Sequence, residues 1–479
     1  MSQEITRRNF LKATGCSVVA GTLSTMAAKP ARAAGITVAP DSGPIAIWVT
    51  AGTQRFAPVA PLTWQTAAGA ADSAIVLSPE KKFQDMLGFG AAFTDAACYT
   101  FNRLEPSARE KLFHELFHPS EMALSVCRIC MGSSDYSTKA YSYDDGDPDP
   151  ELKRFSIDHD REYILPVLRQ ARQANPDLFL FGSPWSPPGW MKAGGSLLGG
   201  SMRRKYLPNY AQYFLKFLQA YDAGGVPVQA VTPQNEVDTD QDGRMPACIW
   251  AQEYEIEFVG RYLGPLLEQN KLATKIWILD HNYNLWGRAV ASLDNQDLHK
   301  YCNSIAWHGY VGTPEMMSKA HDAHPDAEMY WTEGGPDHTS PDYLTDWAKW
   351  GKTFTDALRN WCRGITGWNL ALDEQGRPNI GPFSCGGVVT IHSQTRDITR
   401  SGQYWAFAHF SRAIQRGARR FDSRSTLPDV YHVAFENPDG KRVVLLTNAG
   451  PSRKITLKMD NSQCDVTLEP SSVTTLSWS

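Results

Sequence analysis

Two short stretches of the sequence each end in a glutamate that could carry acid–base chemistry. Residues 227–236 form a small, apolar stretch that ends in an amide and a carboxylate side by side, Asn235 and Glu236. Residues 327–335 form an aromatic stretch that ends in Glu333 and two glycines. Burying a carboxylate without partners is costly, so a glutamate at the end of a buried strand needs a reason. The pattern predicts an acid/base pair that faces one substrate, and a structural salt bridge is the alternative.

The elements that must position this pair alternate regularly from about residue 81 onward. We expect strands at residues 86–90, 125–130, 178–181, 228–231, 275–279, 304–307, 328–331 and 364–368. Helical patterns separate them. Eight strand–helix units in series require a parallel sheet with right-handed crossovers. The simplest such sheet is a closed (β/α)8 TIM barrel, an α/β fold, over residues 81–416. A doubly wound open sheet is the alternative, although no G-x-G-x-x-G motif follows the first strand.

Both ends of the chain are predicted to form β structure without helices. Short strands are expected at residues 45–50, 62–66, 74–77, 431–435, 442–446, 454–459, 464–468 and 473–478. The strands near the N-terminus have no helical partners of their own. We therefore expect residues 34–80 and 417–479 to build one all-β side domain, a β-sandwich, beside the barrel.

The first residues carry a targeting pattern. Arg7 and Arg8 lie in a twin-arginine motif, a weakly apolar region follows at 13–28, and residues 31–33 fit an A-x-A cleavage site. We expect residues 1–33 to be a signal peptide recognised by the twin-arginine export machinery, which places the protein in the periplasm or outside the cell. A basic amphipathic helix is the alternative. No stretch is long and apolar enough to be a stable membrane span.

Composition narrows the class of partner. The net charge of −4 argues against a nucleic-acid partner, which would usually require a basic face. The 15 Trp, 18 Tyr and 20 Phe fit either a carbohydrate enzyme, in which aromatic faces stack on sugars, or a large aromatic core. Cys127 and Cys130 form a C-x-x-C match inside a predicted strand, which places them on opposite faces. We therefore expect free, buried cysteines and no metal or redox pair.

The active site of a TIM barrel lies at the carboxyl ends of its strands. The polar and aromatic residues expected there are Phe93, Thr94, Asp95, Ser133, Ser134, Asp135, Tyr136, Ser183, Trp185, Ser186, Asn235, Glu236, Asp280, His281, Asn282, His308, Tyr310, Glu333, Trp368 and Asn369. Most of the eight strands supply a carboxylate or a tryptophan, which favours one cavity over scattered loop residues.

Six motifs in these stretches resemble those of glycoside hydrolase family 30, the relatives of glucosylceramidase and of microbial β-1,6-glucanases. They are GFGAAFTD at 88–95, GSSDYS at 132–137, SPWSPPGWMK at 183–192, QNE at 234–236, WTEG at 331–334 and WNLAL at 368–372. The resemblance runs through most of the chain after residue 33. It implies a retaining enzyme whose barrel carries a side β domain built from both chain ends, with no cofactor or metal.

The resemblance also implies roles for the two glutamates. Glu333 would be the nucleophile, and Glu236 would protonate the leaving oxygen and then deprotonate water. Asn235 would hydrogen-bond the sugar 2-hydroxyl. Because Glu236 must start protonated, its pKa is expected to be raised by the negative charge of Glu333.

Further residues match the family at positions around this pair. His308 and Tyr310 resemble residues that orient the nucleophile, although His308 has the alternative of a core histidine. Asp135, Trp185 and Trp368 resemble walls of the −1 subsite, with core packing as the alternative for the tryptophans. Arg128 lies one strand step below and is expected to pair with a catalytic carboxylate, unless its role is purely structural.

Two departures bear on the substrate. The aromatic residue that glucosylceramidase-like members carry between the histidine and tyrosine of the sixth strand is Gly309 here, and residues 237–246 are strongly polar. A polar oligosaccharide fits such a lip better than a ceramide. We therefore expect a retaining β-glycosidase that hydrolyses β-glucosidic bonds in β-1,6-glucan or related β-glucosides. The alternatives are a xyloside, fucoside or glucosylceramide as substrate, or a non-catalytic carbohydrate-binding barrel.

Overall fold

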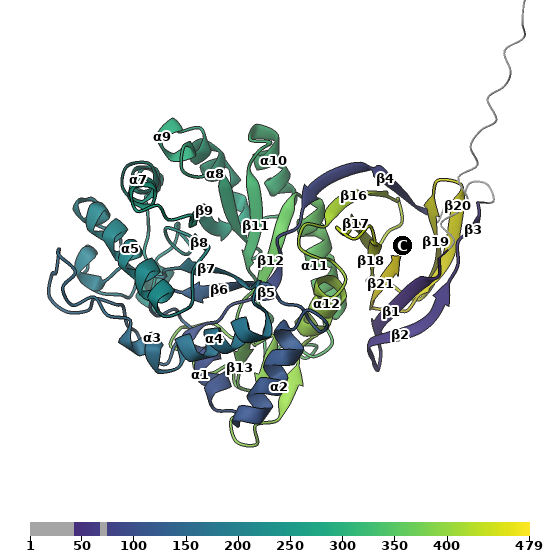
Figure 1. Cartoon of the computed structure of the whole chain (residues 1–479), viewed down its shortest axis with the longest axis horizontal. Coiled ribbons are helices and arrows are strands. Elements are labelled where there is room, and N and C mark those ends of the chain that lie inside the picture. Colours follow the sequence, from purple (N-terminus) through teal and green to yellow (C-terminus); the bar gives the residue numbers. More distant parts are fainter. Residues whose placement is uncertain (1–42, 68–73) are drawn as a thin grey trace, which may run out of the picture. The chain divides into compact units, whose positions relative to one another are not determined.

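The computed structural model describes residues 43–67 and 74–479 (Figure 1). The expected signal peptide, residues 1–33, lies outside the described residues. The described residues form a parallel barrel and an all-β domain. None of the helices in this part of the chain is long and apolar enough to cross a membrane.

The barrel consists of the eight parallel strands expected from the sequence. They are β5 (Gly88–Ala91), β6 (Val126–Cys130), β7 (Phe179–Ser183), β8 (Ala230–Val231), β9 (Lys275–Asn282), β10 (Ser304–His308), β11 (Glu328–Glu333) and β12 (Cys362–Gly367). Their order is β5-β12-β11-β10-β9-β8-β7-β6. The two outer strands then meet, because Ser125 N donates to Phe89 O at 2.7 Å and Phe93 N donates to Arg128 O at 2.8 Å. The predicted (β/α)8 barrel is therefore confirmed, and the open-sheet alternative is wrong.

The helices lie around the outside of these strands (Figure 1). They are α1 (Asp95–Asn102), α2 (Pro106–Phe117), α3 (Asp158–Glu162), α4 (Ile164–Ala174), α5 (Leu207–Ala223), α6 (Gln252–Glu257), α7 (Gly264–Gln269), α8 (Trp286–Leu293), α9 (Gln296–His299), α10 (Glu315–Ala323), α11 (Trp347–Arg359) and α12 (Gly402–Ser411). Apolar residues at helical spacing bury one face of α11, where Trp350, Phe354 and Leu358 are buried. A π-helical segment, Phe258–Leu263, separates α6 from α7.

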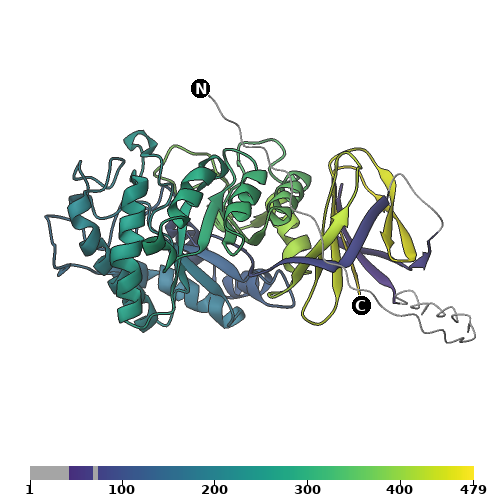
Figure 2. The same ribbon diagram turned by 90° about the horizontal axis from the view of Figure 1, so that it is seen from above.

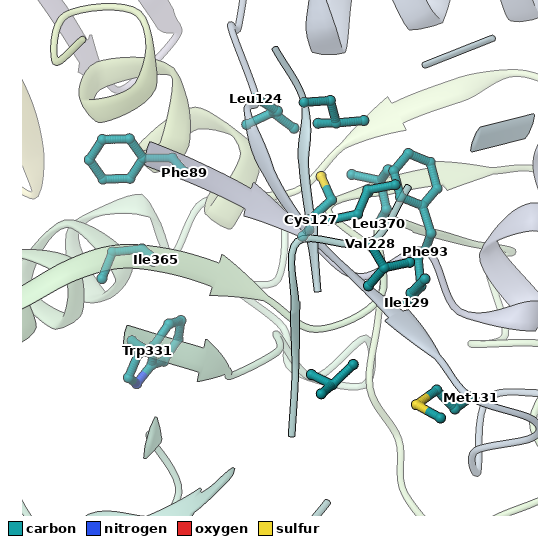
Figure 3. Packing of buried hydrophobic residues seen from close by; sticks show 14 of the residues in the cluster. Phe89, Phe93, Leu124, Cys127, Ile129, Met131, Val228, Trp331, Ile365 and Leu370 are labelled. Atoms are coloured by element: carbon teal, nitrogen blue, oxygen red, sulfur yellow. The ribbon is translucent and has the colours of Figure 1, made fainter. Parts of the chain in front are cut away.

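Apolar side chains pack on both faces of the barrel strands. On the outer face, Phe89, Cys127 and Ile365 belong to a large cluster that includes helix residues (Figure 3). Inside the barrel, a smaller cluster contains Val126, Phe181, Ala230, Trp277, Ala306 and Tyr330. Trp277 stacks on Tyr330 with ring centroids 4.0 Å apart. The interior is therefore filled below the carboxyl ends of the strands, as is usual in this fold.

The cysteines lie in these apolar layers. Cys127 belongs to the outer cluster, whereas Cys130 belongs to a separate cluster with Trp185 and Trp368. The C-x-x-C pair thus faces opposite sides of β6. All eight cysteines of the described residues are free.

The all-β domain is a ten-stranded sheet built from both ends of the chain. Its strands are β1 (Ile45–Ala51), β2 (Gln54–Leu62), β3 (Gln65–Thr66), β4 (Ala74–Asp85), β16 (Arg419–Arg424), β17 (Val430–Glu436), β18 (Arg442–Asn448), β19 (Arg453–Met459), β20 (Ser462–Leu468) and β21 (Ser472–Trp478). β1 pairs with β21, and β4 lies between β16 and β19. Figure 2 shows the purple N-terminal strands among the yellow C-terminal ones. The predicted side domain is confirmed.

Some details of this domain differ from the sequence expectation. β4 continues to Asp85, so the expected boundary at residue 80 falls inside a strand. β2 and β16 were not expected as strands. The domain is joined to the barrel helices by buried hydrogen bonds. His409 of α12 contacts Thr50 and Thr475 at 2.8 Å each, and Trp347 of α11 donates to Ser471 O at 2.7 Å.

Candidate active site

A cavity of about 430 Å³ lies at the carboxyl ends of the barrel strands. Its lining consists of Asp135, Trp185, Asn235, Glu236, Thr239, Gln241, Met245, His281, Asn282, Tyr310, Glu333, Trp368, Phe383 and Cys385. Of the nine residues to which the sequence analysis gave a role at the site, all but two line this cavity. The exceptions, Arg128 and His308, are fully buried and contact both cavity glutamates between them.

The polar layer beneath the cavity follows from strand alternation. The apolar residues Val126, Phe181, Ala230, Ala306 and Tyr330 share the barrel interior. Side chains two positions further along a strand point to the same face. The residues at those positions are Arg128, Ser183, Thr232, His308 and Thr332, all of them buried. The interior therefore changes from apolar to polar within one layer, directly below the cavity.

Strand β9 joins this layer through an irregularity. Two positions after Trp277 comes Leu279, yet the residue that contacts the polar layer is Asp280. Leu279 and Asp280 have positive φ values of 74° and 47°, and the register with β10 shifts between Ala306 and Trp307. A bulge of this kind re-aims the following side chain. Non-glycine residues at positive φ cost about 1–3 kcal/mol each and cluster at functional sites.

Asp280 has five hydrogen-bond neighbours in the polar layer, one of which is His308, whose Nε2 lies 3.0 Å from Oδ1. Three groups donate to Asp280 Oδ2: Thr232 Oγ1 at 2.6 Å, Ser183 Oγ at 2.9 Å and Arg128 Nη2 at 2.6 Å. Thr332 Oγ1 donates to the other carboxylate oxygen at 2.8 Å. Burial alone would raise the pKa of Asp280, but the Arg128 charge, the His308 ring and the Thr232 hydroxyl hold it below its usual value. Asp280 is therefore a fixed negative charge beneath the cavity.

Arg128 connects Asp280 to both glutamate-bearing segments, through contacts with Asn235 and Glu333. It has no exposed surface, and its Nη1 contacts Glu333 Oε2 at 2.5 Å. Its Nη2 donates to Asn235 Oδ1 at 2.7 Å. The guanidinium also lies 4.5 Å from the centre of the Trp185 ring. The ion pair that the sequence predicted for Arg128 is present, and it is made with Glu333.

His308 lies between the two glutamates and Asp280. Its Nε2 is 3.0 Å from Asp280 Oδ1 and 3.8 Å from Glu333 Oε2, while its Nδ1 is 3.4 Å from Glu236 Oε1. Burial disfavours the imidazolium, but Glu333, Asp280 and Glu236 outweigh it and raise the pKa of His308 to about 9. A positive charge therefore sits between three carboxylates at neutral pH.

Glu236 follows β8 with φ of +53°, the second strained position at the site. Its backbone N–H donates to Asp280 O at 2.9 Å, which fixes the turn. Gln241 Nε2 donates to its carboxylate Oε2 at 2.6 Å. Burial raises the pKa of Glu236, but His308, His281 and Gln241 together lower it below its usual value. The expectation of a raised pKa is wrong for Glu236, because it counted Glu333 and omitted these three neighbours.

Glu333 ends β11 and is held by two donors. Tyr310 OH donates to Oε1 at 3.0 Å, and Arg128 contacts Oε2. Burial raises the pKa of Glu333, and the opposing charges of His308 and Arg128 do not cancel the rise. Both oxygens of this carboxylate therefore have defined positions facing the cavity.

The cavity walls include two stacked tryptophans and a buried carboxyl group. The rings of Trp185 and Trp368 lie 5.0 Å apart at an angle of 22°. Asp135 is 3% exposed, and its Oδ1 has no hydrogen-bond partner within the described ranges. Burial, then Glu333 and Glu236, raises the pKa of Asp135 well above its usual value. Asp135 lines the cavity, so this unpartnered oxygen is available to a ligand hydroxyl.

The sequence did not single out several residues that complete the site. Asp280 stood at a predicted strand end, so the strand pattern could have found it. Gln241 and Thr239 come from the polar stretch after Glu236. Phe383 and Cys385 come from the segment between β13 (Ala371–Leu372) and β14 (Val389–Ile391). These two strands and β15 (Ile398–Arg400) form a small sheet that was not expected. No local sequence signal marks which loop residues reach a cavity.

The absence of a side chain at Gly309 has a steric explanation in this chain. A Cβ at Gly309 would lie 2.7 Å from the Trp331 indole, and one at Gly334 would lie 2.3 Å from it. The indole of Trp331 therefore occupies the space beside both glycines. An aromatic side chain at position 309 would require Trp331 to move.

Comparisons with known proteins agree with this architecture. The protein-family model of the glycosyl hydrolase family 30 TIM-barrel domain matches residues 86–414, and that of the family's beta sandwich domain matches residues 417–476. An endo-1,6-beta-D-glucanase of Neurospora crassa is 32% identical over 78% of this chain and 80% of its own length. The lysosomal acid glucosylceramidase of Mus musculus is 30% identical over 78% and 77%.

Solved structures give the same result. The endo-beta1,6-glucanase BT3312 superposes with a TM-score of 0.83 at 29% identity, covering 91% of this chain and 99% of that one. SrfJ from Salmonella typhimurium superposes with a TM-score of 0.87 at 26% identity, with the same coverage. With the two glutamates at the carboxyl ends of the barrel strands and a β domain built from both chain ends, the chain belongs to glycosyl hydrolase family 30.

Proposed function

We propose that this chain, a glycoside hydrolase of a retaining family, cleaves β-1,6-linked glucans with Glu333 as nucleophile and Glu236 as general acid and base. The observation that carries the roles is the position of His308. One imidazole ring reaches Glu236 at 3.4 Å and Glu333 at 3.8 Å, and both glutamates line the same cavity. Retention requires two such carboxyl groups about 5–5.5 Å apart.

The contacts of Glu333 suit a nucleophile. Tyr310 and Arg128 each hold one of its oxygens, which fixes the carboxylate before attack on the anomeric carbon. Arg128 also stabilises the ionised form that attack requires. In the second step, water activated by Glu236 displaces Glu333 from the glycosyl intermediate.

Glu236 needs a proton in the first step, and Gln241 is one of the neighbours that oppose its protonation. Gln241 lies at the cavity, whereas His308 is fully buried beneath it. A leaving-group oxygen that approaches Glu236 therefore displaces the Gln241 amide rather than the imidazole. Loss of this donor raises the pKa of Glu236, so the acid becomes protonated as the substrate arrives.

The sugar in the −1 subsite contacts the remaining cavity residues. The Trp185 and Trp368 rings form an apolar wall. The unpartnered Oδ1 of Asp135 accepts a sugar hydroxyl. The Asn235 side chain, oriented by Arg128, is free to donate its amide hydrogens to the 2-hydroxyl, where bonds strengthen in the transition state.

The choice of β-1,6-glucan has two supports. Relatives named endo-1,6-beta-D-glucanase from Neurospora crassa and Trichoderma harzianum are 32% and 31% identical to this chain. The segment after Glu236 places the polar residues Thr239 and Gln241 in the cavity lining, which suits a hydroxyl-rich chain on the leaving-group side.

A second candidate is a β-glucoside with an apolar aglycone, of the glucosylceramide type. Large exposed apolar residues gather in segments that follow barrel strands: Leu198, Ile249, Tyr310, Val311, Leu344 and Phe383 are between 39% and 51% exposed. Such residues offer either stacking platforms for sugars or contacts for a lipid chain. Glucosylceramidases also stand among the relatives.

The test is product release from linear β-1,6-glucan, β-1,3-glucan, glucosylceramide micelles and aryl β-glucosides, xylosides and fucosides. NMR of the first-formed anomer follows. We expect glucan fragments from the β-1,6-linked chain, with a β reducing end. An α product means inversion and contradicts both glutamate roles. Preference for glucosylceramide, a xyloside or a fucoside would contradict β-1,6-glucan as the substrate and keep the mechanism. No hydrolysis at all favours a non-catalytic carbohydrate-binding barrel.

We also propose that the protein is exported by the twin-arginine machinery and acts in the periplasm or outside the cell. The support is the twin-arginine motif at Arg7 and Arg8. The free cysteines of the described residues suit a protein that folds in a reducing compartment before export. Replacing both arginines by lysines should leave the enzyme in the cytoplasm in a fractionation assay, and unchanged export contradicts the proposal.

A further inference from the structure

Two histidines at the cavity present ring nitrogens that make no hydrogen bond. The Nδ1 atoms of His281 and His308 are buried and unpartnered within the part of the chain that the structure describes. Both lie near one oxygen, Glu236 Oε1, at 3.9 Å and 3.4 Å. One ligand atom from each of the three residues lies within 4.8 Å of the other two. The reaction proposed above uses no function of His281.

We propose that His281 Nδ1, His308 Nδ1 and Glu236 Oε1 form an inhibitory site for a divalent cation of the Zn²⁺ or Cu²⁺ class. Two imidazoles and one carboxylate are an established ligand set for zinc, and imidazole also suits copper. Zinc bonds of about 2.0–2.2 Å place tetrahedral ligand atoms roughly 3.4 Å apart. The His308–Glu236 edge already has this length, and the His281–Glu236 edge must shorten by about half an ångström.

The second ring nitrogen of His308 is oriented as in known metal sites. Metal-bound histidines usually donate their other N–H to a carboxylate, which fixes the ring. His308 Nε2 lies 3.0 Å from Asp280 Oδ1, and Asp280 is itself held by Ser183, Thr232 and Arg128. Nδ1 of His308 is therefore held near Glu236 Oε1 by a rigid support, without rearrangement of the layer below.

The electrostatics also favour a cation at this point. Glu236, Glu333 and Asp280 surround His308, whose imidazolium now supplies the compensating charge. A divalent cation replaces the Nδ1 proton, which leaves to solvent, and retains a positive charge between the carboxylates. The fourth coordination position faces the cavity, where water can fill it. The cation binds Glu236 Oε1, an oxygen of the carboxyl group that must carry the catalytic proton, so it blocks protonation of the leaving group.

Binding and inhibition are measured separately, since only the loss of activity rests on the proposed role of Glu236. Isothermal titration of the purified chain with Zn²⁺ should give one site, and Co²⁺ should give visible absorption bands of a four-coordinate ion. His281→Gln should weaken Zn²⁺ binding by about 100-fold or more. Its residual hydrolysis, whatever its level, should no longer respond to Zn²⁺ or to chelator.

Two control variants exclude other ligands. His324 lies outside the cavity near Asp294 and His299, so His324→Gln removes a competing surface histidine and should leave the Zn²⁺ affinity unchanged. Cys385→Ser removes the thiol of the cavity and should also leave the affinity unchanged. The proposal is overturned if His281→Gln binds Zn²⁺ like the wild type, or if either control abolishes binding. Binding without inhibition would overturn the role of Glu236 and keep the site.

Discussion

Gln241 donates a hydrogen bond to Glu236 at 2.6 Å from a turn in which Gln241 itself has φ of +53°. Glu236 and Asp242 also have positive φ values, of 53° and 52°. Three strained non-glycine residues within one short segment indicate that the surrounding structure enforces this contact. The strained turn keeps an amide donor on the proposed acid until a substrate replaces it.

Removing this donor should shift the pH profile. Gln241 stabilises the ionised form of Glu236, and a hydrogen bond to a charged group contributes about 1.5–3 kcal/mol. In Gln241→Ala the pKa of Glu236 rises, so the basic limb of kcat/KM, which reports loss of the acid's proton, should move upward by about one to two pH units. Arg244→Ala, in the same turn but exposed, is the control and should leave the limb in place. An unmoved limb in Gln241→Ala would show that the contact does not set the acid.

The two glutamates should respond differently to the leaving group. Glu236→Gln should slow glucan hydrolysis by about 10²–10⁴-fold, because a poor leaving oxygen needs a proton. The first step on a dinitrophenyl β-glucoside, whose leaving group needs none, should change little. Glu333→Gln should lose both reactions. Equal losses in the two substrates for Glu236→Gln would contradict its role as the acid.

Arg128 should contribute to stability as well as to activity. It is fully buried and paired with Asp280 and Glu333, so Arg128→Met removes the arginine partner of two buried carboxylates. Removing one partner of such a buried network costs about 3–5 kcal/mol in the free energy of unfolding. Lys352→Ala breaks a partly exposed pair with Asp356 and should cost less than about 1 kcal/mol. Denaturant unfolding of both variants compares the two, and similar costs would contradict a structural role for the buried network.

The strand pattern predicted most of this network, and its limits have a physical origin. Arg128, His308 and Glu333 occur where a regular period of two or a strand end puts them, so their positions follow from the sequence. Asp280 enters the layer one residue late, because β9 bulges at Leu279. A bulge depends on the pairing with neighbouring strands, which a single sequence does not display.

Loop contributions were predictable as a class but not as contacts. The polar character of residues 237–246 was visible, whereas the hydrogen bond of Gln241 to Glu236 depends on a strained turn. Cys385 and Phe383 reach the cavity because a small sheet of β13, β14 and β15 folds their segment inward. The predicted direction of the Glu236 pKa shift was wrong for the same reason, because neighbours from three separate segments decide whether the pKa is raised or lowered.

His308 should make the stability of the fold depend on pH. Its pKa is raised to about 9, above the usual value of 6.5, by Glu333, Asp280 and Glu236 against the cost of burial. The protonated ring therefore adds stability that is fully present below about pH 6.5 and is lost as the pH rises through about 9.

The effect can be isolated by comparing variants. The free energy of unfolding of the wild type should fall between pH 6.5 and 9.5, by an amount on the order of a few kcal/mol for a shift of this size. His308→Gln should be less stable at pH 6.5, and its curve should be flatter across the same range. His392→Gln removes a half-exposed histidine near Glu374 and should follow the wild type. If the wild type and His308→Gln lose stability in parallel, the charge between the three carboxylates is not the imidazolium of His308.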